Sequence, residues 1–169
     1  MKIHGINRRV DELGRIVIPV EIRRLLNIKE GENLEFIIKN EALELKKISY
    51  VVNNKDYIVD IGEKLNNVID GDFFISDRNE IIYSSNKEII NKRLPYELHK
   101  YLLIHENTLS ADINLSFENK SIHGIFNIFP FYSENDIAGM IVTYNSTNVE
   151  YYKKLISFVG SLIHDKLSL

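Results

Sequence analysis

The stretch GINRRVDELGRIVIPVEIRRLL, from Gly5 to Leu26, decides how the first part of the chain folds. The acidic start and closing glycine of Asp11–Gly14 predict a tight turn. Candidate strands flank this turn at Ile6–Val10 and Arg15–Ile18. Pro19 then ends the second strand and begins a helix, because proline fixes φ and needs no hydrogen-bond donor at a helix start.

That helix is predicted over Val20–Asn27. Ile22, Leu25 and Leu26 follow the i, i+3, i+4 spacing of an apolar helix face. The charged side chains of the segment fall on the opposite face, where solvent or a charged partner can reach them.

A β-hairpin is predicted next, because residues 34–39 and 42–48 flank the polar pair Asn40–Glu41. One short helix and a few strands in about fifty residues bury little apolar surface, and folds of this size usually need a staple or a partner. The chain has no cysteine and shows no metal-binding motif. A second copy of the chain is therefore the expected partner.

Positive charge is concentrated at the N-terminus, although the whole chain has a formal net charge of −3. Residues 1–24 carry six basic and three acidic groups, whereas residues 51–169 carry eleven basic and sixteen acidic groups. This distribution predicts a basic working end on an acidic body. Five of the seven arginines lie in the first 24 residues, and they are Arg8, Arg9, Arg15, Arg23 and Arg24.

The composition of the 169 residues is that of an ordinary folded protein, with 44% hydrophobic and 27% charged residues, which excludes global disorder. No apolar run approaches the roughly 18 residues that span a bilayer. The N-terminus has no apolar signal-peptide core, and the absence of cysteine fits a reducing compartment. We therefore expect a cytoplasmic protein without a membrane partner.

Two domains are expected, at residues 1–52 and 57–169, joined by the polar stretch 51–56. The second is predicted to be an α+β domain with one antiparallel sheet. Along the chain, two strands come first, a helical stretch follows, and two or three further strands complete the sheet. Its predicted elements are a helix at 57–69, strands at 73–75, 81–83, 121–130 and 137–143, helical segments at 87–91 and 97–105, and a helix at 149–167.

The run DELGR-IVIP-EIRR, followed by Leu34-Glu35 and Leu45-Lys46-Lys47, resembles the AbrB-type DNA-binding domain of bacterial transition-state regulators. The resemblance covers roughly residues 1–50. It implies a swapped-hairpin β-barrel, in which two chains interleave their strands into one domain. It also implies DNA binding through Arg8, Arg15, Arg23 and Arg24, with Arg9 at a position that is basic in relatives.

The second domain is similar, in its length and order of elements, to the GAF-like module that accompanies this N-terminal domain in a sporulation regulator. A PAS-like domain is an alternative for the same α+β pattern. The resemblance implies a role in spore development.

Arginine suits a DNA interface, because its planar fork binds phosphate oxygens and guanine edges. The alternative is that these arginines form a solvated surface and pair with Asp11, Glu12 and Glu21. Asp11 is a candidate to orient Arg15 or to cap the turn.

No catalytic or cofactor-binding residues are predicted, because the chain has no nucleophile elbow, P-loop or dinucleotide fingerprint. His99 and His105 are six residues apart, which does not place them on one helix face as metal ligands. Seven aromatic residues of the second domain are expected in its core, with a small-molecule effector pocket as the alternative. They are Phe73, Phe74, Tyr83, Phe126, Phe129, Phe131 and Tyr144.

The sequence thus favours a sequence-specific transcriptional regulator that binds double-stranded DNA as a homodimer or homotetramer. Tyr151 and Tyr152 of the last helix are candidates to pack against a second copy. The alternative is a metabolite-sensing or protein-scaffolding module, similar to an antitoxin, whose N-terminal barrel serves mainly dimerisation.

Overall fold

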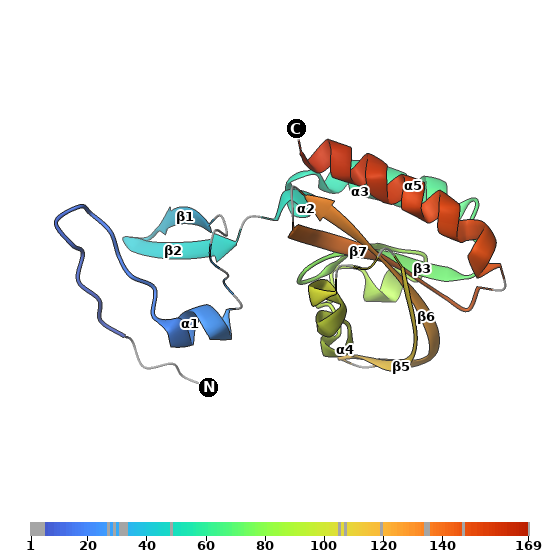
Figure 1. Cartoon of the computed structure of the whole chain (residues 1–169), viewed down its shortest axis with the longest axis horizontal. Helices are drawn as coiled ribbons and strands as arrows, with labels where there is room; N and C mark the ends of the chain where they lie inside the picture. Colours follow the sequence, from blue (N-terminus) through green and yellow to red (C-terminus); the bar gives the residue numbers. More distant parts are fainter. Residues whose placement is uncertain are drawn as a thin grey trace. The chain divides into compact units, whose positions relative to one another are not determined.

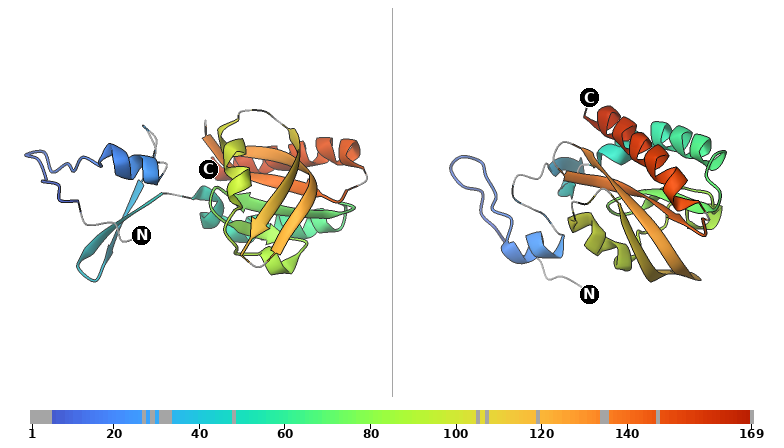
Figure 2. Two further views of the ribbon diagram at one scale, coloured as in Figure 1. Left: turned by 90° about the horizontal axis from the view of Figure 1, so that it is seen from below. Right: turned by 45° about the vertical axis from the view of Figure 1, so that its right-hand side comes forward.

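A computed structural model divides the chain into two compact units, Met1–Ile48 and Ser49–Leu169. We name the first unit the head and the second the body (Figures 1 and 2). The residues that the structure describes are 6–26, 28, 30, 34–47, 49–104, 106, 108–118, 120–133, 136–146 and 148–168.

The described part of the head contains one short helix and one β-hairpin. Helix α1 (Val20–Leu25) begins directly after Pro19, whose carbonyl accepts a hydrogen bond from the Arg23 amide. Strands β1 (Leu34–Lys39) and β2 (Ala42–Lys47) pair in antiparallel register. The two turn residues between them have φ values of 47° and 63°, as a tight hairpin turn requires. The structure therefore confirms the predicted helix and hairpin.

The prediction of strands at residues 6–10 and 15–18 is wrong for the single chain. Neither segment belongs to a strand, and the described part of the head contains only the β1–β2 sheet. A strand needs a hydrogen-bonded neighbour, and no described strand of the same chain pairs with these segments. A swapped-hairpin barrel needs a second chain, so it remains a prediction.

The body is built on a five-stranded antiparallel sheet with the order β4-β3-β7-β6-β5. This confirms the predicted α+β body with one antiparallel sheet. The sequence leaves two or three strands open after the helical middle, and the structure has three. The strands are β3 (Asp72–Asp77), β4 (Ile81–Ser84), β5 (Leu109–Phe117), β6 (Lys120–Ser133) and β7 (Asp136–Tyr144).

Helices cover both faces of this sheet. Helix α3 (Lys55–Asn66) and the long helix α5 (Val149–Leu167) pack on one face, where Figure 1 shows them side by side. The short helical segments η1 (Lys87–Ile89), α4 (Tyr96–His99) and η2 (Lys100–Leu103) pack on the other. The body therefore has a layer of buried apolar side chains on each side of the sheet.

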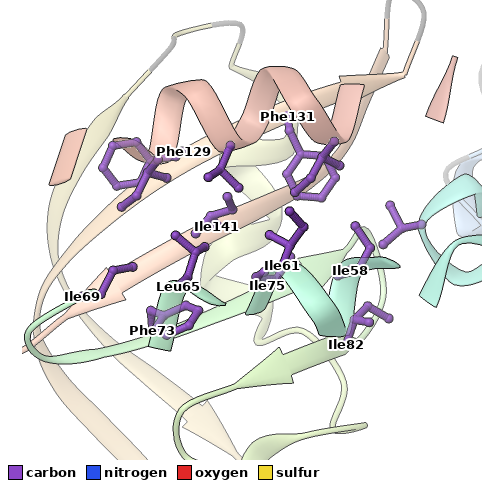
Figure 3. Packing of buried hydrophobic residues seen from close by; sticks show 14 of the residues in the cluster. Ile58, Ile61, Leu65, Ile69, Phe73, Ile75, Ile82, Phe129, Phe131 and Ile141 are labelled. Atoms are coloured by element: carbon purple, nitrogen blue, oxygen red, sulfur yellow. The ribbon is translucent and has the colours of Figure 1, made fainter. Parts of the chain in front are cut away.

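Figure 3 shows the layer beneath α3 and α5, where Phe129 and Phe131 of β6 lie among isoleucines of the helices and strands. Fully burying a side chain of this size contributes about 1.5–3 kcal/mol. Of the α5 residues predicted to face inward, Leu155 and Leu162 are half-buried. The other four are buried, and they are Tyr152, Ile156, Val159 and Ile163.

Residues 51–56, which the sequence predicts as a polar connection, are largely helical. Helix α2 spans Tyr50–Asn53, and α3 begins at Lys55. Val51 is only 1% exposed and packs in the core beneath α3 and α5. Although the stretch is polar overall, its residue Val51 packs in the core of the body and fixes the stretch there.

Candidate nucleic-acid interface

Asp11 organises the turn that carries Arg15. Its Oδ1 accepts hydrogen bonds from the backbone amides of Leu13 and Arg15, at 3.0 and 2.8 Å. Its Oδ2 accepts a 2.7 Å hydrogen bond from Arg15 Nε. Gly14 closes the turn with a φ of 76°, in the left-handed region that favours glycine. The structure thus confirms both predicted roles of Asp11, since it caps the turn and holds the Arg15 side chain.

These contacts also set the charge state of Asp11. The backbone and side-chain hydrogen bonds from Arg15 hold the pKa of its carboxyl below the ordinary value. Arg15 itself is 70% exposed, so its guanidinium is steadied by the carboxylate and still faces solvent. An arginine held in this way can reach a phosphate or a base edge without first being ordered.

Arg8 and Arg9 precede the turn on the extended segment. Both are exposed, and Arg8 Nη1 donates a 3.3 Å hydrogen bond to the neighbouring carbonyl of Asn7. Figure 1 shows residues 6–19 as a long open loop that projects away from α1 and the hairpin. Arg8, Arg9 and Arg15 therefore share one loop.

Arg23 and Arg24 form a second group, in the last turn of α1. Positive charge there is favourable, because the carbonyl end of a helix carries partial negative charge. Arg24 is exposed, whereas Arg23 is half-buried, and its buried Nε has no hydrogen-bond partner within the described residues. The single chain thus presents the five predicted arginines on two separate parts of the head.

One face of the head hairpin is apolar and uncovered. Phe36 lies opposite Leu45, and Ile38 lies opposite Leu43, so the four side chains share a face. The exposed fraction is 63% for Phe36, 37% for Leu45, 82% for Ile38 and 51% for Leu43. This face is absent from the predicted sites, although alternating apolar residues on both sides of a two-residue turn are its signal. An exposed apolar patch of this kind marks a binding surface.

The spacing of His99 and His105 argues against a shared metal site. His99 Nε2 lies 3.2 Å from the Leu94 carbonyl, and His105 lies outside the described residues. Within the described ranges, no three His, Asp or Glu side chains form a metal-binding group. No helix among them is long and apolar enough to cross a membrane.

The seven aromatic residues do not gather in one pocket. Phe73, Phe129 and Phe131 belong to the core under α3 and α5, whereas Phe74 and Phe126 belong to the opposite core. Tyr144 is buried in this second core too, and Tyr83 is half-buried. The prediction that they serve mainly as core is confirmed for the six buried ones.

The whole chain and its head are each similar in sequence to known proteins. Stage V sporulation protein T of Bacillus subtilis is 31% identical over 155 residues, which cover 86% of this chain and 85% of that protein. The chain belongs to the stage V sporulation protein T family. The match covers 155 residues, so the relationship extends beyond the head into the body.

The head alone is similar to two shorter regulators of B. subtilis. Transition state regulatory protein AbrB is 55% identical over 47 residues, 28% of this chain and 49% of that protein. Putative transition state regulator Abh is 49% identical over 47 residues, 28% of this chain and 51% of that protein. A family model described as antidote-toxin recognition MazE, bacterial antitoxin, matches residues 8–52. The expected AbrB-type head is therefore confirmed.

Among solved structures, the PAS domain of Bordetella pertussis BvgS covers 64% of this chain, and the alignment spans 98% of that domain. The sequence identity is 10% and the TM-score is 0.38. The description of the body therefore rests on its own sheet order and helix placement.

Proposed function

We propose that the chain is a sequence-specific DNA-binding regulator of sporulation genes, acting as a homodimer or homotetramer. The observation that carries the proposal is the 55% identity between the head and transition state regulatory protein AbrB. The names of this relative and of stage V sporulation protein T supply the regulatory and sporulation context.

Pairing of two heads into a swapped-hairpin barrel is the first part of the proposal. Twelve large apolar side chains of the described head are at least 37% exposed, and Pro19 is its one buried residue. A unit with so little buried apolar surface is not stable alone. A second head would cover the apolar hairpin face and give the segments at 6–10 and 15–18 strands to pair with.

DNA contact through the arginines is the second part. Arg8, Arg9 and Arg15 would meet the duplex from the loop, and Arg23 and Arg24 from α1. Pairing doubles the number of these charges on one surface. Phosphate contacts would supply the affinity, and arginine contacts to base edges or to groove shape would supply the specificity.

Association of bodies is the third part, and it concerns the outer face of α5. Tyr151 and Phe158 are 73% and 60% exposed, and the half-buried Leu155 and Leu162 continue the same stripe at helical spacing. Tyr152 does not belong to it, since it is buried and its hydroxyl oxygen accepts a hydrogen bond from the Asp70 amide. The stripe supports further self-association from dimer to tetramer.

A second candidate is an antitoxin-like or scaffolding role, which the match of residues 8–52 to the MazE antitoxin model favours. In that case the head would serve dimerisation and present the body to a protein or a metabolite. The body has two apolar cores. It is thus a folded unit rather than a short tail that folds on a toxin.

Selection from a pool of random duplexes separates these candidates. The proposal expects the full-length chain to enrich a defined DNA motif, while light scattering on the same sample gives the mass of a dimer or tetramer. A dimer that enriches no motif would support the second candidate.

A further inference from the structure

The two edges of the body sheet differ in how they are protected. Edge strands expose unpaired N–H and C=O groups, and proteins commonly blunt them with short strands, bulges, lysine, proline or a covering segment. Strand β4 has four residues, and its register with β3 shifts between Ile75 and Ser76. A neighbouring segment also covers it, because the Ile81 amide donates to the Lys92 carbonyl and the Asn91 amide donates to the Ile81 carbonyl. The β4 edge is therefore short, irregular and partly bonded.

Strand β5, at the other edge, has none of these protections. It is nine residues long and pairs with β6 in one continuous register without a shift. It contains no proline, glycine, lysine or arginine, and Asp112 is its one charged residue. Alternate residues of an antiparallel edge strand point their N–H and C=O away from the neighbouring strand. Among the residues that the structure describes, none forms a backbone hydrogen bond with these outward groups of β5.

The side chains of β5 form two rows, one on each face of the sheet. The polar row is exposed, and it consists of Ser110, Asp112, Asn114 and Ser116. The apolar row lies on the α4 side of the sheet, and it consists of Leu109, Ala111, Ile113, Leu115 and Phe117. Only Leu115 of this row is fully buried, so the row is incompletely covered in the single chain. A strand that pairs with β5 therefore has to match one apolar row and one polar row.

A second copy of β5 matches the polar row. When two copies pair in antiparallel orientation about Ile113, Asp112 lies opposite Asn114 of the second copy. An amide can donate to a carboxylate, and Ser110 lies opposite Ser116, so no like charges face each other. A register centred on Asp112 instead brings two carboxylates together, which is unfavourable. The pattern of charge thus favours the register centred on Ile113.

The apolar row fits the same register. Ala111 lies opposite Leu115 of the second copy, and Leu109 lies opposite Phe117. Apolar cross-strand pairs of this kind stabilise a sheet. Leu109, Ala111 and Phe117 are half-buried in the single chain, so pairing removes more of their apolar surface from water.

We propose that two bodies associate by antiparallel pairing of their β5 strands about Ile113, which joins their two five-stranded sheets into one continuous sheet. Each strand gives and receives the same contacts, as in other two-fold interfaces. This interface lies on the sheet edge and is separate from the apolar stripe on α5. The inference concerns the bodies and does not depend on DNA binding by the head.

Single cysteines in the full-length chain test the register, because the chain has no cysteine of its own. Ile113→Cys places two thiols directly opposite each other, within the Cα separation that a disulfide allows. Mild oxidation should therefore give a covalent dimer on a non-reducing gel. The pairing places Ser110 of one copy about 20 Å along the strand from Ser110 of the other. Ser110→Cys, the matched control, should therefore form far less of this dimer.

Charged pairs give a second test, at positions that are exposed in the single chain. Ser110→Lys/Ser116→Lys opposes like charges at both ends of the pair and should weaken self-association about fivefold or more, measured by sedimentation velocity. Ser110→Lys/Ser116→Glu opposes unlike charges and should restore association to the native level or above.

Two results would overturn the proposal. One is that Ile113→Cys forms no more covalent dimer than Ser110→Cys. The other is that the two double variants associate with equal affinity. An edge that pairs with a strand of another protein, instead of with a second copy, would give both of these results.

Discussion

At the residue scale, Asp11 does more for the loop that carries Arg8, Arg9 and Arg15 than its position in a turn suggests. It accepts hydrogen bonds from two backbone amides and from the side chain of Arg15. Sequence reasoning finds this pair, since an acidic residue four positions before an arginine across a turn is a local feature. It does not find the half-buried state of Arg23, which depends on how the rest of the head packs.

The Asp11 turn should lose its order in acid. The folded-state pKa of Asp11 is lower than the ordinary value of about 3.9. Its stabilising effect is therefore complete above the unfolded pKa and lost as pH falls through the lowered folded pKa. An NMR titration that follows the Leu13 and Arg15 amides should give a midpoint below 3.9, and Arg15→Gln should raise it. Equal midpoints in the two proteins would show that Arg15 does not hold the carboxylate.

Asp77 should be among the polar residues on which body stability depends most. It is 2% exposed, and its carboxylate accepts hydrogen bonds from the amides of Asn79 and Glu80 and from the Ser49 hydroxyl. Asp77→Ala leaves these partly buried donors without their acceptor and should cost about 1–3 kcal/mol in the free energy of unfolding, measured in urea. Asp77→Asn keeps one acceptor oxygen and should cost less. If Asp77→Ala lowers the free energy of unfolding by less than about 0.5 kcal/mol, Asp77 is not one of the main polar contributors to body stability.

At the scale of elements, replacing each of two helical glycines by alanine should change the free energy of unfolding in opposite directions. A Cβ at Gly62 of α3 would overlap the Tyr83 ring, so Gly62→Ala should lower the free energy of unfolding by about 1–3 kcal/mol. The same change at Gly160 of α5 makes only an ordinary 3.8 Å contact with Phe131 Cβ and should raise it by about 0.5–1 kcal/mol. Urea denaturation of both variants checks this. Destabilisation by Gly160→Ala would mean that α5 packs more tightly than described.

Helix α5 and the two hairpins are the elements that sequence predicts best. The helix at 149–167 has the predicted bounds, because its apolar spacing is regular over five turns. The hairpin at Asn40–Glu41 follows from two polar residues that accept a left-handed backbone. These signals are local, so neighbouring residues suffice to predict them.

Strand β5 and the head strands are the elements that the sequence prediction missed or misplaced, for opposite reasons. Strand β5 (Leu109–Phe117), on an edge of the sheet, has a regular alternation of apolar and polar residues, a local strand signal that the prediction overlooked. The segments at 6–10 and 15–18 have a strong strand signal but no partner in their own chain.

At the scale of the whole molecule, the apolar hairpin face of the head should control assembly. Ile38 is 82% exposed in the single chain and would be buried between two heads. Ile38→Glu should therefore lower the mass measured by analytical ultracentrifugation and weaken DNA binding at least tenfold. Glu44→Gln, on the other face of the hairpin, is the matched control and should change neither. Unchanged mass in Ile38→Glu would remove this face from the dimer interface.

The most direct test of the account is the salt dependence of DNA binding, measured by fluorescence anisotropy on an AT-rich promoter duplex. The native chain should bind with a steep slope of log affinity against log salt. Arg23→Ala/Arg24→Ala removes four positive charges from a dimer and should make that slope shallower by up to about 3–4. Lys153→Ala/Lys154→Ala, on α5, should leave it unchanged. If all three proteins bind with equal affinity and equal slope, the arginines of α1 do not form the DNA surface.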